Sequence, residues 1–129
     1  MNPALAFAEL IEANLLNTGY TVFVNHAPDQ PDNVILIYEI GRGRMEERRM
    51  RTGITDEHPL LHVMVRGQDS SARAILESIG GITDAAYDFA LSNGQKLRVI
   101  TKSNTIGFAG QEQQTRRYLY TQQFRLTLE

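Results

Sequence analysis

The stretch "RRYLYTQQFRLTL", residues 116–128, decides the fold class because apolar and polar side chains alternate along it. One side of the predicted strand carries Tyr118, Tyr120, Phe124, Leu126 and Leu128. The other side carries Arg117, Thr121, Gln123, Arg125 and Thr127. Such a strand is typical of an antiparallel sheet with a core on one face and water on the other. We therefore expect Arg117 and the other side chains on its side of the strand to be solvent-exposed.

Four other segments predict strands. Residues 34–40, "VILIYEI", are apolar on both faces, as in the middle of a sheet. Residues 60–66, "LLHVMVR", form the next strand. Residues 20–24 and 95–103 are rich in β-branched or alternating residues and complete a set of five.

Two helices are expected. Residues 3–16 have apolar residues at spacings of three and four, with Pro3 in the first turn and Asn-Thr-Gly as a stop signal. Residues 70–91 carry a longer apolar stripe: Ala72, Ile75, Ile79, Ile82, Ala86 and Phe89. Gly80 and Gly81 interrupt this helix, which predicts a kink or a close approach to the sheet rather than a hinge.

The resulting order is α-β-β-β-α-β-β. Several strands follow one another without a helix between them, so strands and helices do not strictly alternate. This order indicates an α+β fold: a mainly antiparallel sheet of about five strands with two helices packed on one face. The length of 129 residues favours a single domain spanning 1–129. Ordinary composition, no signal-peptide pattern and no membrane-length apolar run predict a soluble intracellular domain.

No pattern of catalytic residues is present. The chain has no cysteine, so a thiolate nucleophile and cysteine-ligated metals are excluded. His58 and His62 are four apart, but His62 lies in a predicted strand and Pro59 intervenes, so the helical metal-ligand spacing fails. Asp84 and Asp88 fit a solvated helix edge better than an acid/base pair. We therefore expect no enzymatic activity, metal or cofactor.

The most unusual segment is "RGRMEERRMR", residues 42–51, with a charge of +3 on a chain of net charge −2. The rest of the chain therefore sums to −5. The segment lies in one of two predicted long loops, 41–59 and 104–115, which we expect to be flexible in the isolated subunit and to serve binding. Its five arginines are the candidate partner contacts: Arg42, Arg44, Arg48, Arg49 and Arg51.

Arginine pairs bidentately with carboxylates and with phosphates, so two partner classes remain open. One is an acidic protein surface. The other is nucleic acid, which would make the chain a small nucleic-acid-binding accessory protein. A nucleic-acid-binding domain usually carries a wide basic face, whereas this cluster is local and the body is acidic, so the protein partner is favoured.

The order of elements, with "LLNTGYTVFVN", "PDNVILIYEIG", "LHVMVRG" entering a long helix and "YTQQFRLTL" at the end, resembles the tail-terminator and minor capsid proteins of long-tailed bacteriophages. The resemblance covers nearly the whole chain, but residues 42–51 depart from it. It implies a virion protein, assembled in the host cytoplasm, that forms a homo-oligomeric ring, commonly a hexamer. Such a ring caps the tail tube, stops its polymerisation and presents a joining surface to the head connector. The implied partners are thus the tail tube and head connector proteins, with no membrane and no specific nucleic acid.

Overall fold

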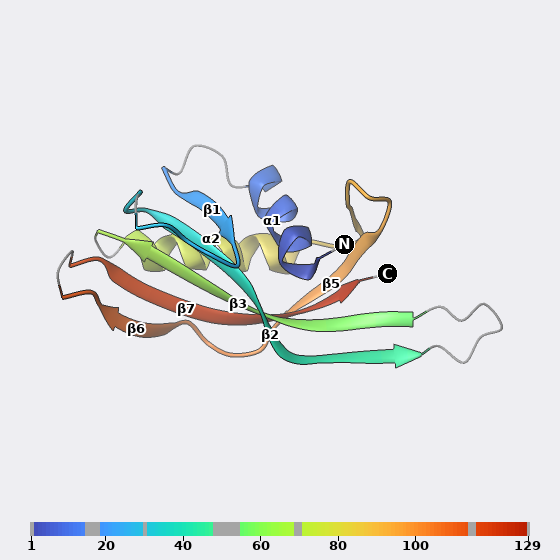
Figure 1. Cartoon of the computed structure of the whole chain (residues 1–129). Coiled ribbons are helices and arrows are strands. Elements are labelled where there is room, and N and C mark those ends of the chain that lie inside the picture. The colour runs from blue at the N-terminus through green and yellow to red at the C-terminus, as the bar shows by residue number, and fades with distance from the viewer. Residues whose placement is uncertain are drawn as a thin grey trace.

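A curled sheet with two helices against one of its faces makes up the described part of the chain (Figure 1). The computed structural model describes residues 2–14, 19–29, 31–47, 55–68, 71–113 and 116–128, and of residues 41–47 and 55–57 it describes the backbone. The elements, in chain order, are α1 (Pro3–Asn14), β1 (Thr21–Val24), β2 (Val34–Glu47), β3 (Thr55–Gly67), α2 (Ser71–Ala85), β4 (Phe89–Ala90), β5 (Lys96–Lys102), β6 (Gly107–Gln111) and β7 (Tyr118–Leu128).

The strands follow the order β1-β2-β3-β7-β5-β4 across the sheet. Strand β7 has β3 along one edge, while its other edge is shared by β5, opposite residues 124–128, and β6, opposite residues 118–121. Only the pair of β1 and β2 is parallel; the other described pairs are antiparallel. The predicted α+β class, the two helices and the mainly antiparallel sheet are confirmed, but the described strands number seven rather than five.

The core lies between the helices and the sheet face that they cover. The Phe7 ring of α1 meets the Phe124 ring of β7 at a centroid distance of 5.3 Å. Around them lie fully buried aliphatic side chains from both helices and the central strands: Leu10, Ile11, Ile35, Ile37, Leu61, Val63, Leu76, Ile79 and Leu126. Each such side chain stabilises the fold by about 1.5–3 kcal/mol on burial. The alternation read from the sequence therefore predicts the covered face of β7 correctly at Phe124, Leu126 and Leu128, whereas the stripe predicted for the second helix omits the buried Leu76 and extends past the end of α2.

Helix α2 ends earlier than predicted, whereas the predicted end of α1 lies outside the described residues. Helix α1 begins with the Asn2 side chain accepting a hydrogen bond from the Ala4 N–H (2.9 Å), an N-cap, and ends at Asn14; residues 15 and 16 lie outside the described range. Helix α2 ends at Ala85 rather than at 91, because Asp88 adopts a left-handed conformation (φ 51°) and its N–H bonds to the Arg98 carbonyl. The chain then enters β4, and Phe89 pairs with Leu97 of β5.

The glycine pair in α2 does not end the helix. A Cβ added to Gly80 would lie 3.1 Å from Lys102 Cε, so the predicted close approach to the sheet is confirmed there. Gly81 has open space around it.

Both predicted loops contain strands. Strand β2 continues to Glu47 and β3 begins at Thr55, so the loop prediction for 41–59 is wrong for 41–47 and 55–59. These residues pair across a hairpin, which satisfies their backbone groups without any apolar periodicity. Strand β6 lies inside the predicted loop 104–115 because it pairs with the start of β7. The expected flexibility of residues 48–54 falls outside the described residues.

Candidate partner-binding surfaces

The hairpin arm, defined as residues 41–47 of β2 and 55–59 of β3, extends beyond the rest of the sheet at the end away from β6 (Figure 1). Its register pairs Arg44 with His58 and Glu47 with Thr55, after an irregularity between Ile40 and Arg44. Such an irregularity bends a strand and increases its twist. Two glycines, Gly41 and Gly43, fall in this interval, where the arm leaves the sheet.

The five candidate arginines are only partly placed by the structure. Arg42 and Arg44 belong to the β2 half of the arm. Arg48, Arg49 and Arg51 lie outside the described residues. The prediction that these five residues contact a partner therefore stays a prediction, but two of them are now assigned to a projecting strand instead of a loop.

The arm is a segment of mixed charge. Besides the arginines, it carries the carboxylates of Glu46, Glu47, Asp56 and Glu57. The register sets Glu46 directly opposite Asp56. Like charges opposite one another in an antiparallel pair are unfavourable. The acidic residues therefore favour a partner that offers both charge signs, which a protein surface does and a phosphate backbone does not.

The outer edge of β2 is open along the arm. Strand β1 pairs only with Val34–Ile37, and the Asn25 N–H extends this contact with a bond to the Ile37 carbonyl. From Glu39 to Glu47 no described strand lies on that side. An uncovered edge presents unpaired N–H and C=O groups, and these can pair with another chain.

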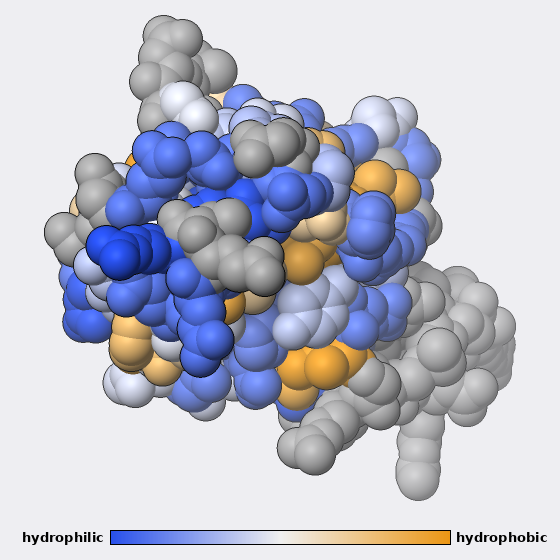
Figure 2. All heavy atoms as spheres, turned by 60° about the vertical axis from the view of Figure 1, so that its left-hand side comes forward, coloured by the Kyte–Doolittle hydropathy of each residue, from blue (hydrophilic) through white to orange (hydrophobic). Residues whose placement is uncertain are grey.

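A second open edge lies at the opposite end of the sheet, on β6. This strand pairs with β7 on one side and with no described strand on the other. Its sequence, "GFAGQ", contains no charged residue and no proline. Phe108 is 58% exposed, and its ring packs on those of Tyr120 (5.3 Å) and Tyr118 (6.3 Å). The surface at this end of the molecule is otherwise mainly hydrophilic, with small separate hydrophobic areas (Figure 2).

Two buried arginines lie beside the end of β6. Arg117 is 1% exposed and pairs with Asp29 (2.9 Å), Glu112 (3.0 Å) and Asp32 (3.4 Å). The hydrogen bond that Arg117 donates to Glu112 is the main cause that raises the pKa of Arg117, and burial opposes it. The prediction that Arg117 is solvent-exposed is wrong, because these carboxylates enclose its guanidinium group.

The other buried arginine, Arg66, holds the connection between β1 and β2. Its guanidinium group donates to the carbonyl oxygens of Pro28 (2.8 Å), Pro31 (2.9 Å) and Asp29 (3.3 Å). Burial, followed by the charge of Arg117, lowers the pKa of Arg66. Together the two arginines fix the loop 25–33 against β3 and β7. The sequence signal is the pair of aspartates, Asp29 and Asp32, in "APDQPDN", a segment whose prolines and polar residues otherwise indicate only a loop.

His58 and His62 lie apart on β3. His62 stacks on Tyr38 of β2 (centroids 4.9 Å, planes 19° apart), and burial lowers its pKa. His58 Nδ1 lies 3.3 Å from the Thr127 hydroxyl. Four residues of extended strand separate the two histidines by about 13 Å, too far for one shared metal ion. Among the described residues, no group of three or more His, Cys, Asp or Glu side chains is placed to hold a metal.

Asp84 and Asp88, predicted on one solvated helix edge, do not share a helix. Asp84 lies on α2 and binds Lys102 (2.9 Å), whereas Asp88 lies beyond the helix and binds Arg98 (2.8 Å). Each aspartate therefore neutralises a cation of β5.

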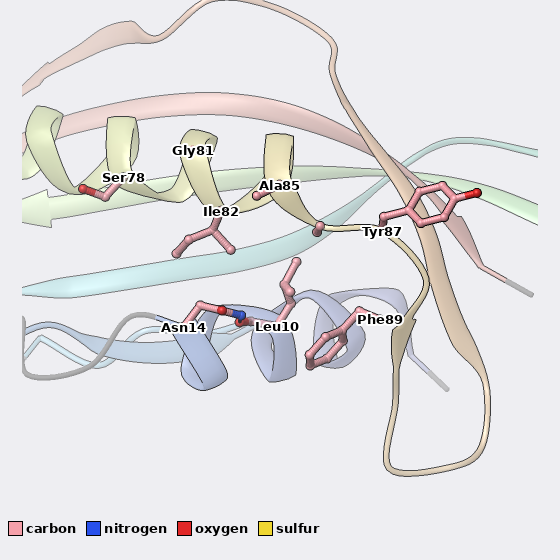
Figure 3. A pocket seen from close by; sticks show the side chains of 9 residues that line it. Leu10, Asn14, Ser78, Gly81, Ile82, Ala85, Tyr87 and Phe89 are labelled. Carbon is pink, nitrogen blue, oxygen red and sulfur yellow. Dashed lines mark hydrogen bonds between the residues drawn. The ribbon is translucent and has the colours of Figure 1, made fainter.

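An open groove of about 540 Å³ lies between α1 and the C-terminal half of α2 (Figure 3). Leu10 and Ile82 point toward one another across it. Asn14, Ser78, Ala86 and Phe89 complete most of its wall. The lining combines apolar side chains with the polar groups of Asn14, Ser78 and Tyr87 and contains no charged residue. The groove therefore has no arrangement of side chains that indicates catalysis or the binding of a charged ligand.

Comparison with protein-family models and with curated protein sequences gives no match for this chain. In the part of the chain that the structure describes, neither helix has the length and apolar character needed to span a bilayer.

Proposed function

We propose that the protein is a structural subunit that assembles into a homo-oligomeric ring and acts, like phage tail terminators, as a cap and joining piece at the end of a tail tube. The observation that carries the proposal is the hairpin arm, which extends away from the sheet and leaves the outer edge of β2 open from Glu39 to Glu47. A projecting strand pair of this kind reaches beyond its own subunit.

The two ends of the subunit present different surfaces, and this difference supports assembly into a ring. One end bears the arm, and the other bears the β6 edge with the exposed Phe108. Unlike surfaces at opposite ends favour head-to-tail contacts, and these close into rings when the rotation between subunits permits. The six-fold symmetry and the tail tube and head connector partners come from the resemblance alone.

The mass and shape of the oligomer formed by the purified chain test the proposal. Sedimentation velocity and native mass spectrometry of the full chain, over a concentration series, should show one discrete oligomer beside the monomer. Negative-stain images of that oligomer should show rings with a central opening. A protein that stays monomeric at the highest soluble concentration, or forms only two-fold dimers, contradicts the proposal.

A further inference from the structure

We infer that the ring contact is a continuous intermolecular sheet, in which the open β2 edge of one subunit's arm pairs with the open β6 edge of a second copy. The inference rests on the proposed function and names the surfaces that would close the ring. Main-chain hydrogen bonds would supply the contact, as when an extended segment adds a strand to a sheet edge.

Strand β6 lacks the features that natural proteins use to protect a sheet edge. Edges are commonly blocked by charged side chains, by proline or by a covering element. Residues 107–111 have no charge and no proline, and no described element covers their outer side. Phe108, at 58% exposure, adds an apolar group beside the free backbone. The irregularity between Phe108 and Gly110 is the one protective feature present.

The other free edges among the described residues fit less well. Strand β5 carries Lys96, Arg98 and Lys102, which are charges of the kind that protect an edge. Strand β4 has two residues, too few for a ladder. Strand β1 has four residues and no charge, but its side chains pack against the core at Val22 and Val24. Strand β1 is therefore the rival that the experiment must separate from β6.

Net charge weakly favours contact between the arm of one copy and the body of another copy over contact between two arms. Residues 41–59, which include the arm, carry five arginines and four carboxylates, a net charge of +1, and the remainder of the chain carries −3. Two paired arms would therefore bring like net charges together, whereas an arm on the body of another copy brings opposite net charges into contact. At the β6 end itself the charges balance, because three carboxylates (Asp29, Asp32 and Glu112) lie near three arginines (Arg66, Arg116 and Arg117).

The absence of cysteine allows a direct test by disulfide trapping. One chain carries Ala109→Cys on β6, and a second, differently tagged chain carries Met45→Cys on the arm. Mixing them under mild oxidation should give a covalent heterodimer that a reducing agent reverses. The matched controls replace Ala109→Cys by Ala74→Cys, on the exposed side of α2, or by Thr21→Cys, at the start of β1. Both positions are exposed, so unspecific collision would trap them as well.

A second test introduces a charged side chain at the same position of β6. Ala109→Lys should raise the concentration needed for assembly about tenfold or more, because a buried unpaired charge at the edge costs over 1.4 kcal/mol. Ala74→Lys, the same substitution on α2, should assemble like the wild type. Thermal unfolding of both variants checks that the subunit still folds.

The outcomes separate the two proposals. Trapping at 109 but not at 74 or 21, with loss of assembly in Ala109→Lys, supports the contact between β2 and β6. Rings that form normally in Ala109→Lys, or trapping at Thr21→Cys in preference to Ala109→Cys, overturn this contact while the ring function stands. A wild type that never assembles overturns both.

Discussion

Arg117 and Asp29 lie 88 residues apart in the chain, yet Arg117 Nη2 and Asp29 Oδ1 are 2.9 Å apart. The same guanidinium group binds Glu112. This one side chain therefore ties the loop before β2 to the turn between β6 and β7, close to the open β6 edge.

We expect Arg117→Met to lower the free energy of unfolding by about 2–4 kcal/mol. Removing one member of a buried ion pair costs about 3–5 kcal/mol, and the partly exposed carboxylates reduce that loss because water can hydrate them. Urea denaturation followed by circular dichroism measures the change. Arg73→Met is the matched control, because the Arg73–Glu77 pair on α2 is exposed and such pairs contribute about 0–1 kcal/mol. Equal losses in the two variants would contradict the structural role of Arg117.

Replacement by alanine should have opposite effects on stability at Gly81 and at Gly67. Gly81→Ala should stabilise the protein by about 0.5–1 kcal/mol, since a Cβ there meets open space and glycine is unfavourable within a helix. Gly67→Ala should destabilise it by about 1–2 kcal/mol, because the new Cβ would collide with the Tyr20 hydroxyl and disturb its 3.0 Å hydrogen bond to Ser71. Melting temperatures of the two variants should move in opposite directions from the wild type. A lower melting temperature for Gly81→Ala would show that α2 is not helical at this position.

The sequence was sufficient to predict the elements that bury an apolar face. It was not sufficient for the arm, because residues 41–47 have no apolar period and become a strand only through pairing with 55–59. Strand β6 was missed for the same reason. The alternation of β7 predicts Arg117 on the polar face. Arg116, the preceding residue, has a positive φ (57°), so the regular alternation of β7 does not extend back to Arg117. Its partners come from distant segments, and no local pattern indicates them.

His62 should make stability depend on pH. Its native pKa lies below the ordinary value of 6.5 because burial against Tyr38 disfavours the charged ring. The unfolded chain therefore binds the proton more readily, so stability is lost as the pH falls through about 6.5 toward the lower native pKa. His62→Gln should flatten this part of the curve of unfolding free energy against pH, measured between pH 8 and 5. His26→Gln, at an exposed position, is the matched control for the substitution itself. An unchanged slope in His62→Gln would refute the assignment.

The last prediction separates a protein partner from nucleic acid for the arm. Replacing Arg44, Arg48, Arg49 and Arg51 by serine should leave the subunit folded, because exposed charges contribute little to stability. The same variant should weaken assembly, because its arm becomes acidic through its four carboxylates and is repelled by the acidic body of the next copy. Sedimentation of wild type and variant, with circular dichroism as the folding control, measures both effects.

A titration with duplex DNA at several salt concentrations completes the comparison. Five arginines on phosphates would give a slope of about −4.5 in log affinity against log salt. We expect no such binding at micromolar concentration, because the remaining chain carries −5 and opposes the approach of DNA within a Debye length of about 8 Å. Steep, salt-dependent DNA binding by the wild type, together with normal assembly of the serine variant, would assign the arginines to nucleic acid. Loss of assembly without DNA binding would assign them to the contact between subunits.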